Sequence, residues 1–347
     1  MRDGKFGFGL IGASTISRER MVGAMNGSGV ALPVAVFSRD LARGRTFAAE
    51  MGIPKAYDRL DEMLADPEVD GVYVASTNER HHREVLACAA AGRHVLCDKP
   101  LAMSLAEAED MVRACEAAGV VFATNHHMRC GAHHIAMREI VRSGRLGDLV
   151  VIRVVHGALL PAHLQTWRIN DPATGAGAIM DLAVHDADIV RFLTGDEIVE
   201  ISAMSKNSGM GTDKIEDTAL AIFRTAGGTL GHIHNVFNTP FNRGSIEIHG
   251  TKGSLYARDN MGQSPEGTVH LRDAEGLHEI PLEHEDLYVR MVRSVVAAAR
   301  GEGEAACTGQ DGLRSLAVAL AMLESAASGR AVPVPASQVS SQPGGSV

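Results

Sequence analysis

Cysteine is scarce in this chain of 347 residues, and its spacing excludes the common cysteine-based frameworks. The five cysteines, Cys88, Cys97, Cys115, Cys130 and Cys307, form no C-x-x-C pair and are odd in number. A cysteine zinc site needs closely spaced pairs, and a secreted disulfide scaffold needs an even set. We therefore predict reduced thiols, which are typical of a cytoplasmic protein.

The sequence also lacks basic runs and long apolar segments. Its net charge of −9 disfavours binding to nucleic acid or to an anionic membrane. No apolar stretch approaches the length of about 20 residues that a membrane helix needs. The first residues enter a strand-like run with no signal-peptide core. These absences predict a cytoplasmic protein with neither a nucleic-acid nor a membrane partner.

Histidine is abundant, but its spacing does not indicate a metal site. None of the sixteen histidines forms an H-x-x-x-H or H-E-x-x-H motif. The adjacent pairs, at 81/82, 126/127 and 133/134, would point to opposite faces of a strand. We predict no metal ion.

The first third of the chain alternates strand and helix signals, which is typical of βαβ units and a parallel sheet. A capping box at Ser104 to Glu107 opens one of the helices, and glycine ends two of them. The expected strands are 6–11, 32–37, 69–75, 94–97 and 120–123, and the expected helices are 16–25, 41–51, 84–91 and 105–118.

The pattern changes near residue 149 to longer strands with fewer helices. Gly227-Gly228 is a hairpin turn signal. The expected strands are 149–156, 198–206, 218–224, 229–237 and 245–250, with helices at 184–193, 287–299 and 312–327. We predict an α/β protein with a Rossmann domain over 1–124, an α+β substrate domain with an open, largely antiparallel sheet over 125–335, and a disordered tail over 336–347.

A glycine-containing turn follows the first strand. Aligned on Gly12, the dinucleotide fingerprint G-x-G-x-x-G reads G-A-S-T-I-S and keeps only its first glycine. Backbone and helix start can bind a pyrophosphate here, and the hydroxyls of Ser14 and Thr15 can donate to phosphate. The alternative is an ordinary βα turn. We expect cofactor contacts at Gly12, Ser14, Thr15 and Ile16.

The end of the second strand predicts the cofactor type. An acidic residue there binds the ribose 2′-hydroxyl of NAD, whereas Ser38, Arg39 and Arg43 suit the 2′-phosphate of NADP. Asp40 is the exception, because its carboxylate could turn inward and favour NAD. The two arginines could also be a solvated helix face. We predict NADP(H).

Two short motifs contain the chemistry of an oxidoreductase. Lys99-Pro100 follows a strand at the carboxyl edge of the predicted sheet, where a lysine can polarise a substrate carbonyl. Asp181-x-x-x-His185 places a carboxylate and an imidazole on one helix face, suited to proton transfer. The alternatives are an ordinary loop for the first motif, and a core histidine with Asp181 as helix cap for the second.

Together these motifs resemble the glucose–fructose oxidoreductase/inositol dehydrogenase (Gfo/Idh/MocA) family over residues 5–330. The resemblance also rests on Thr77-Asn78-x-x-His81, on Asp98-Lys99-Pro100 and on the segment 250–255. It implies a Rossmann domain, an open-sheet domain and a catalytic set of Lys99, Asp181 and His185. The usual glutamate of the family's E-K-P motif is Asp98 here. Cofactor contacts are also expected at Thr77, Asn78, His81, Asp98, Lys99 and Asn125.

Within the family, the segments around 160–168 and 184–188 are similar to a bacterial NADPH-linked sugar reductase. That similarity implies that His156, Trp167 and Arg168 line the substrate pocket together with Lys99, Asp181 and His185. A core tryptophan is the alternative for Trp167. We therefore expect a small-molecule sugar partner and a monomer or homodimer. The competing hypotheses are an NAD-dependent inositol or sugar dehydrogenase and a non-catalytic NADP-binding sensor.

Overall fold

The computed structural model describes residues 4–212 and 215–336, which form two compact units. The first contains residues 4–125 and 288–313, and the second contains 126–287 and 314–336. We predicted 288–313 as part of the second domain, whereas these residues belong to the first unit. The predicted tail lies outside the described residues beyond Ala336.

The first unit is built on a six-stranded sheet in the order β3-β2-β1-β4-β5-β6. All neighbouring strands are parallel. This order is that of a Rossmann fold, with the switch point between β1 and β4, and it confirms the predicted fold class. The strands are β1 Phe6–Ile11, β2 Ala31–Phe37, β3 Lys55–Tyr57, β4 Gly71–Val74, β5 His94–Cys97 and β6 Phe122–Thr124.

Every residue of β1 is buried, which indicates that helices cover both faces of this sheet. The predicted capping interaction is present: the Ser104 hydroxyl accepts a hydrogen bond from the Glu107 N–H at 3.3 Å. The short β3 and α3 were not predicted, since so few residues show no periodicity. The helical segments are η1 Ser17–Met21, α1 Val22–Gly27, α2 Leu41–Met51, α3 Leu60–Ala65, η2 Asn78–Arg80, α4 His81–Ala90, α5 Leu105–Ala117 and α9 Leu287–Ala299.

The second unit contains a nine-stranded sheet in the order β14-β13-β12-β11-β7-β10-β9-β8-β15. Among the described strands of this second sheet, only the β7–β10 pair is parallel, so the predicted largely antiparallel sheet is confirmed. Gly228, at φ +92°, turns β9 into β10 as predicted. The strands are β7 Leu149–Gly157, β8 Ile198–Lys206, β9 Thr218–Thr225, β10 Leu230–Val236, β11 Ser245–Gly250, β12 Ser254–Arg258, β13 Thr268–Asp273, β14 Gly276–Glu279 and β15 Val332–Pro333.

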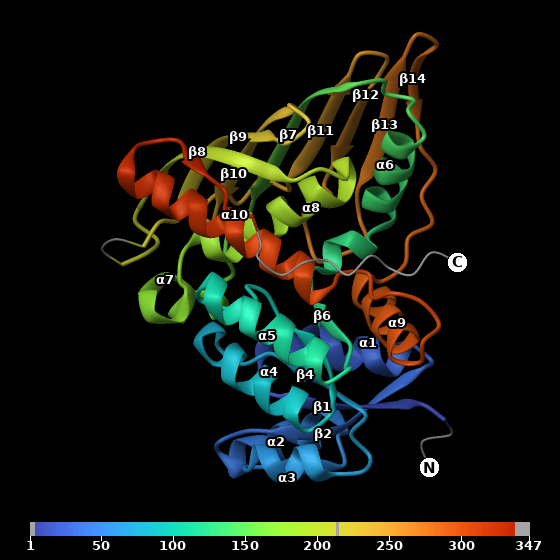
Figure 1. Ribbon diagram of the computed structural model, residues 1–347, viewed down its shortest axis with the longest axis vertical. Coiled ribbons are helices and arrows are strands. Elements are labelled where there is room, and N and C mark those ends of the chain that lie inside the picture. Colours follow the sequence, from blue (N-terminus) through green and yellow to red (C-terminus); the bar gives the residue numbers. More distant parts are fainter. Residues whose placement is uncertain (1–3, 213–214, 337–347) are drawn as a thin grey trace. The chain divides into compact units, whose positions relative to one another are not determined.

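Helices lie against one face of this sheet (Figure 1). On β9, Ala221 and Phe223 are buried whereas Leu220 and Ile222 are exposed, so the other face is open. Helix α6 was not predicted, because its buried side includes histidines that weaken the apolar period. The helical segments of this unit are η3 His127–Cys130, α6 Ala132–Arg142, η4 Ala162–Leu164, α7 Trp167–Asn170, η5 Pro172–Thr174, η6 Ile179–Ala183, α8 Val184–Thr194 and the part of α10 (Gly309–Ser328) from residue 314.

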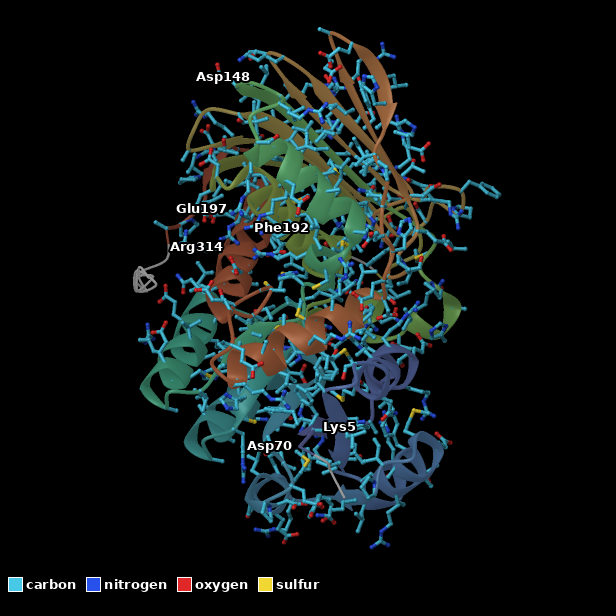
Figure 2. The ribbon with its side chains drawn as sticks, turned by 90° about the vertical axis from the view of Figure 1, so that its right-hand side faces the viewer. Lys5, Asp70, Asp148, Phe192, Glu197 and Arg314 are labelled. Carbon is cyan, nitrogen blue, oxygen red and sulfur yellow. The ribbon has the colours of Figure 1, made fainter. Side chains whose placement is uncertain are left out.

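Ion pairs anchor α10 to the second unit near the start of β8 (Figure 2). Glu197 contacts both Arg314 and Arg191 at 2.7 Å. Burial opposes ionisation of Glu197, but the two guanidinium groups keep its pKa below the usual range. Across residues 4–212 and 215–336, we find no helix of the length and apolarity that a membrane span requires.

Candidate functional site

The predicted site residues fall into two groups, one in each unit. In the first unit, Gly12 directly follows β1 and has a φ of +107°. Its N–H donates to the Phe37 carbonyl at 3.0 Å. A Cβ at this position would lie 3.0 Å from the carbonyl oxygen of Ala75. Only glycine suits this conformation and this close approach, so the single retained glycine of the fingerprint has a structural reason.

Two serines interact with each other at the start of the helix that follows this turn. The hydroxyls of Ser14 and Ser17 lie 2.9 Å apart, and the Ser17 N–H donates to the Ser14 Oγ at 3.3 Å. Ser17 is fully buried, whereas Thr15 is exposed and Ile16 is half-buried. Ser14 therefore also caps the helix, a role that we did not predict.

A guanidinium group reaches the same turn from α2. Arg43 Nη2 donates to the Ala13 carbonyl at 2.9 Å. The carboxylate of Asp40 accepts from the Arg43 N–H at 3.1 Å, so it caps α2. Ser38 is 9% exposed and Arg39 is exposed. The charged group bonded to the turn is thus a cation rather than a carboxylate.

Thr77 and Asn78 follow β4 at the carboxyl edge of the sheet. Thr77 precedes η2, and its hydroxyl donates to Glu79 at 2.6 Å. Asn78 is buried. Both residues come directly after the Ala75–Ser76 backbone that Gly12 approaches, which places them beside the predicted phosphate turn.

The Lys99-Pro100 segment is held from behind by His81. The two ring nitrogens of His81 lie 3.0 Å from the Pro100 carbonyl and 3.2 Å from the Ser76 carbonyl. The His81 ring is fully buried, so it positions the loop that contains Lys99. The predicted contact of His81 with a cofactor stays a prediction. The Lys99–Pro100 peptide bond is cis.

Asn125 links the ends of the central strands. Its Nδ2 donates to Asp98 Oδ1 and to the Tyr73 hydroxyl, both at 3.3 Å. Burial raises the pKa of Asp98, and the ammonium of Lys99 opposes that shift. Asn125 Oδ1 is buried and has no hydrogen-bond partner among the described residues.

These first-unit residues fit a dinucleotide. The close backbone approach at Gly12 leaves no room for a side chain. The orphaned Asn125 Oδ1 is an acceptor that a bound group could satisfy. Both features lie at strand ends of a Rossmann sheet, where such ligands bind.

In the second unit, His185 lies in the first turn of α8 and is 4% exposed. Its Nδ1 is 3.3 Å from the Nδ1 of His126. The ring centroids of His126 and His127 each lie 5.2 Å from that of His185, and the centroid of His156 lies 6.1 Å away. Two facing nitrogens share one proton, so one ring donates and the other accepts. His185 is therefore part of a buried group that can exchange protons.

Asp181 lies one helical turn before His185, within the π-helical turn η6. Such turns are common at functional sites. Arg168 Nε lies 3.8 Å from Asp181 Oδ1, and the Arg168 guanidinium lies 4.5 Å from the centroid of Trp167. Trp167 is half-buried, so it is not a core tryptophan. The structure thus brings these predicted substrate residues together.

Asp181 is not the cap of this helix. The Ile179 N–H at its start donates to the Glu216 carboxylate at 3.0 Å. Burial raises the pKa of Glu216. This cap leaves Asp181 to interact with Arg168, and it excludes the capping alternative considered from the sequence.

His156, near the end of β7, is tied to two residues that were not predicted. Its Nδ1 lies 2.8 Å from Asp186 Oδ1, and Asn235 Nδ2 donates to Asp186 Oδ2 at 2.6 Å. Asp186 and Asn235 are fully buried. The adjacency of Asp186 to His185 could have drawn attention to it. Asn235 gave no signal, because its position depends on strand register.

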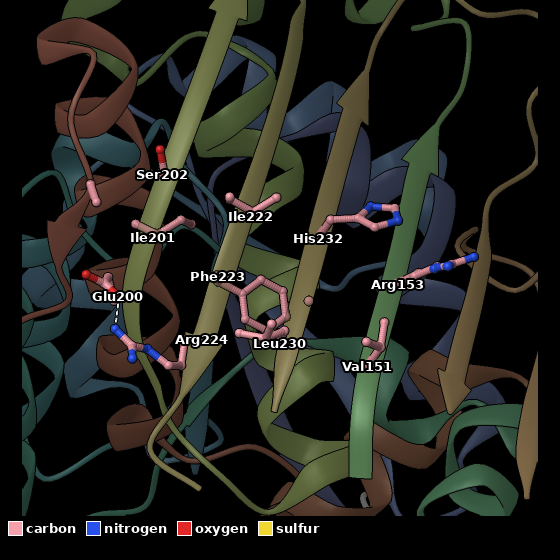
Figure 3. A pocket seen from close by; sticks show the side chains of 12 residues that line it. Val151, Arg153, Glu200, Ile201, Ser202, Ile222, Phe223, Arg224, Leu230 and His232 are labelled. Atoms are coloured by element: carbon pink, nitrogen blue, oxygen red, sulfur yellow. Dashed lines mark hydrogen bonds and ion pairs between the residues drawn. The ribbon is translucent and has the colours of Figure 1, made fainter. Parts of the chain in front are cut away.

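A hollow of about 510 Å³ lies on the open sheet face and involves none of the predicted site residues. Figure 3 shows Ile222, His232 and Arg153 on neighbouring strands there, with an ion pair between Glu200 and Arg224. Its carboxylate, Glu200, is paired with Arg224, and none of the predicted site residues lines it, so we assign it no part in the predicted chemistry.

One group among the described residues could supply three metal ligands. Asp273, Glu275 and His278 lie at the β13–β14 hairpin, distant in sequence from the predicted site residues. Arg145 already contacts Asp273 at 3.2 Å. We assign no metal to it.

Comparison with known proteins identifies relatives along most of the chain. Residues 6–126 match the family model described as "Oxidoreductase family, NAD-binding Rossmann fold" of GFO/IDH/MocA, and residues 134–256 match the GFO/IDH/MocA C-terminal domain. A 1,5-anhydro-D-fructose reductase of Ensifer adhaerens is 44% identical over 94% of this chain and 98% of its own length.

Two further matches are more distant. A myo-inositol 2-dehydrogenase of Thermotoga maritima is 29% identical over 96% of this chain and 98% of its own. The crystal structure of an aldose-aldose oxidoreductase from Caulobacter crescentus, complexed with glycerol, superposes with a TM-score of 0.87 at 23% identity. It covers 95% of this chain and 99% of that structure, and it supports the fold alone.

Proposed function

This chain belongs to the Gfo/Idh/MocA family of NAD(P)-dependent oxidoreductases, and we propose that it catalyses NADPH-dependent reduction of a cyclic sugar ketone. The substrate that we favour is 1,5-anhydro-D-fructose, reduced to 1,5-anhydro-D-mannitol. This choice takes its substrate from the name of the Ensifer adhaerens relative.

The observation that carries the proposal is the cluster around Asp181. Trp167 offers a half-buried aromatic face, and Arg168 lies against both that ring and Asp181. Aromatic faces pack against the C–H surface of a sugar, and guanidinium and carboxylate groups bond its hydroxyls. His185, one turn further on, adds the acid–base group. A hydroxyl-rich ring is the ligand that this combination suits.

The residues then divide the reaction as follows. NADPH, held at the Gly12 turn and beside Ser38 and Arg43, would supply a hydride to the carbonyl carbon. Lys99 polarises the carbonyl oxygen, and Lys99 or His185 gives that oxygen the proton that completes the alcohol. Asp181 orients the sugar through a hydroxyl.

A preference for NADPH is supported by the groups beside the Gly12 turn. Arg43 contacts the turn, and Ser38 lies at the end of β2. The one nearby carboxylate, Asp40, is engaged as a helix cap. A 2′-phosphate would meet a guanidinium and a hydroxyl rather than a negative charge.

An NAD-dependent inositol or sugar dehydrogenase is the second candidate, favoured by the Thermotoga maritima relative. The same Asp181 and His185 could remove a proton from a hydroxyl in the oxidative direction. A non-catalytic NADP-binding sensor is the third, and the acid–base groups of the second unit argue against it.

Absorbance of the nicotinamide separates these candidates. We expect 1,5-anhydro-D-fructose to oxidise NADPH faster than NADH, and inositol with NAD⁺ to give no signal. Reduction of NAD⁺ by inositol without NADPH oxidation would favour the second candidate. Tight NADPH binding with no turnover on a panel of sugar ketones, inositols and aldoses would favour the sensor.

A further inference from the structure

We propose that Asp186, together with Asn235, is a positioning device that fixes the orientation and tautomer of His156. The inference rests on the proposed function and on the predicted place of His156 in the sugar pocket. It assigns Asp186 and Asn235 a role through His156, without contact to substrate.

The geometry is a short chain of three buried side chains. Asp186 uses one carboxylate oxygen for His156 Nδ1, at 2.8 Å, and the other for Asn235 Nδ2, at 2.6 Å. The exposed fractions are 7% for His156 and 0% for the other two residues. Among the described residues, neither Asp186 nor His156 has a further hydrogen-bond partner. The carboxylate is thus committed to one imidazole and one amide.

The single parallel strand pair of the sheet creates this arrangement. His156 of β7 lies directly opposite Asn235 of β10 in the register. Both side chains are buried on the covered face, and Asp186 from α8 bonds both. A slip of β10 by one residue would turn Asn235 to the other face of the sheet and away from His156. The device therefore depends on the register of this strand pair.

The carboxylate decides which ring nitrogen carries the proton. An ionised carboxylate can only accept hydrogen bonds, so Nδ1 of His156 must be the N–H that donates to it. Nε2 is then the ring nitrogen left for a ligand, since the ring makes no second bond to the protein. In the neutral ring it is an acceptor, which suits a donating sugar hydroxyl.

Without Asp186, His156 could exchange tautomers and rotate. A ring with Nε2–H would present a donor where the sugar hydroxyl needs an acceptor. The supporting partners of metal-bound histidines typically contribute 10- to 100-fold to affinity or activity by the same kind of fixation. We expect Asp186→Ala to lower kcat/KM for the sugar by about 10- to 100-fold, mainly through KM, with NADPH affinity unchanged.

Asp186→Asn is the conservative variant. Its amide oxygen can accept from His156, and the Asn235 amide can flip to accept from its NH₂ group. We expect it to recover most of the kcat/KM that Asp186→Ala loses. Asn235→Ala, which removes one of the two carboxylate partners, is expected to lie between the wild type and Asp186→Ala.

Nitrogen-15 NMR of histidine-labelled protein reads the tautomer without any substrate. Signals of His156 are assigned by their loss in His156→Gln. We expect a protonated Nδ1 in the wild type and in Asp186→Asn, and a mixture of tautomers in Asp186→Ala. The matched control is Asp188→Asn, a fully buried carboxylate on the same helix that Arg129 holds instead. It is expected to lower Tm and to leave the His156 signals unchanged.

The outcomes separate this inference from the proposed function. If the wild type reduces no sugar ketone but its His156 tautomer depends on Asp186, the function fails and the positioning device stands. The inference is overturned if Asp186→Ala keeps the wild-type His156 signals. It is also overturned if that variant only lowers Tm while the folded protein retains wild-type KM and kcat.

Discussion

The two units place their polar chemistry in different parts of the fold. The first unit is covered on both faces, so its candidate groups stand at strand ends, and its interior holds thiols such as Cys97 and Cys115. Burial raises the pKa of Cys115 to about 12. The second unit has one covered face, and it buries imidazoles and carboxylates there. Burial, assisted by the nearby His284, lowers the pKa of His133 to about 4.

This difference predicts which substitutions affect activity and which affect stability in each unit. A parallel sheet with continuous apolar strands has little room for polar groups inside, so its ligand site is made of backbone and of edge residues. The layer between the open sheet and its helices holds polar groups that satisfy one another. We expect substitutions at the edge of the first unit to change chemistry, and substitutions inside the second unit to change stability as well.

The largest effect is expected at the edge of the first unit. Lys99→Ala should lower kcat by about 10²- to 10⁴-fold, because it removes the group that polarises and protonates the carbonyl. Its NADPH dissociation constant, measured by quenching of protein fluorescence, should stay within about twofold, since the phosphate turn is untouched. Stopped-flow absorbance of the nicotinamide gives the rate.

Lys206→Ala is the control for this variant, because Lys206 is an exposed lysine at the end of β8. It should retain full activity. Loss of NADPH binding in Lys99→Ala with a normal rate at saturating cofactor would show that Lys99 binds the cofactor. It would also show that the edge of the first unit does not contribute a catalytic lysine.

The second effect sharpens the contrast in stability. Arg129 binds Asp188 with two hydrogen bonds of 2.7 Å, and both groups are buried. Arg129→Met removes both hydrogen bonds and leaves the buried Asp188 with the weaker contact to Arg191 at 4.0 Å, which costs about 3 kcal/mol of unfolding free energy. Urea denaturation measures it. In the first unit, the exposed Arg59 pairs with Asp61, and Arg59→Met should leave the unfolding free energy nearly unchanged, because water screens this pair.

An equal loss of unfolding free energy in these two variants would contradict the comparison, because the ion pairs of the two units would then contribute equally to stability. A loss of unfolding free energy below the expected value in Arg129→Met would also arise if Asp188 became protonated in that variant. Measurement at two pH values, 6 and 8, separates that case, since a protonated carboxyl adds a pH dependence to the unfolding free energy.

The sequence predicted the first unit better than the second, for physical reasons. Apolar strands, Gly12 and the Ser104 cap are local signals, and each predicted strand of that unit is present. The second sheet depends on register: Asn235 lies opposite His156 through the register of the β7–β10 pair, and both bond Asp186. Helix α6 was missed because His133 and His134 replace aliphatic residues on its buried side. Asp186 could not be paired from the sequence, because it lies on α8 whereas its partners lie on β7 and β10.

The third effect is the acid sensitivity of the second unit. His133 is neutral in the folded protein above about pH 4, whereas an unfolded histidine binds a proton below about pH 6.5. The pKa of His133 is lower in the folded than in the unfolded protein. The unfolding free energy is therefore unaffected by this group above pH 6.5, and it falls as the pH drops from 6.5 toward 4. The loss is about 3 kcal/mol from this group. His134, whose pKa burial also lowers, acts in the same direction.

Urea denaturation between pH 7 and pH 4 tests this effect. His133→Gln, which cannot take up a proton, should flatten the acid limb by about 3 kcal/mol relative to the wild type. His82→Gln in the first unit is the control, because His82 is half-exposed and paired with Asp110. An acid limb unchanged in His133→Gln would show that the buried imidazoles do not set the acid stability.

The smallest effect concerns cofactor choice at the first-unit edge. Arg43 is exposed and contacts the turn through the Ala13 carbonyl, so a bond to a 2′-phosphate would be partly screened by water. We therefore expect Arg43→Ala to reduce the preference for NADPH over NADH by about tenfold, equivalent to about 1.4 kcal/mol. The ratio of kcat/KM for the two cofactors measures it.

Arg45→Ala is the matched control, because Arg45 is exposed on the same helix and makes no contact with the turn among the described residues. General electrostatic attraction of the phosphate would lower the ratio equally in both variants, whereas a specific contact lowers it only in Arg43→Ala. An unchanged ratio in Arg43→Ala would leave Asp40 as the deciding group and favour NAD. In that case the edge of the first unit would still bind the dinucleotide through backbone, as the Gly12 geometry requires, but its side chains would not select the phosphate.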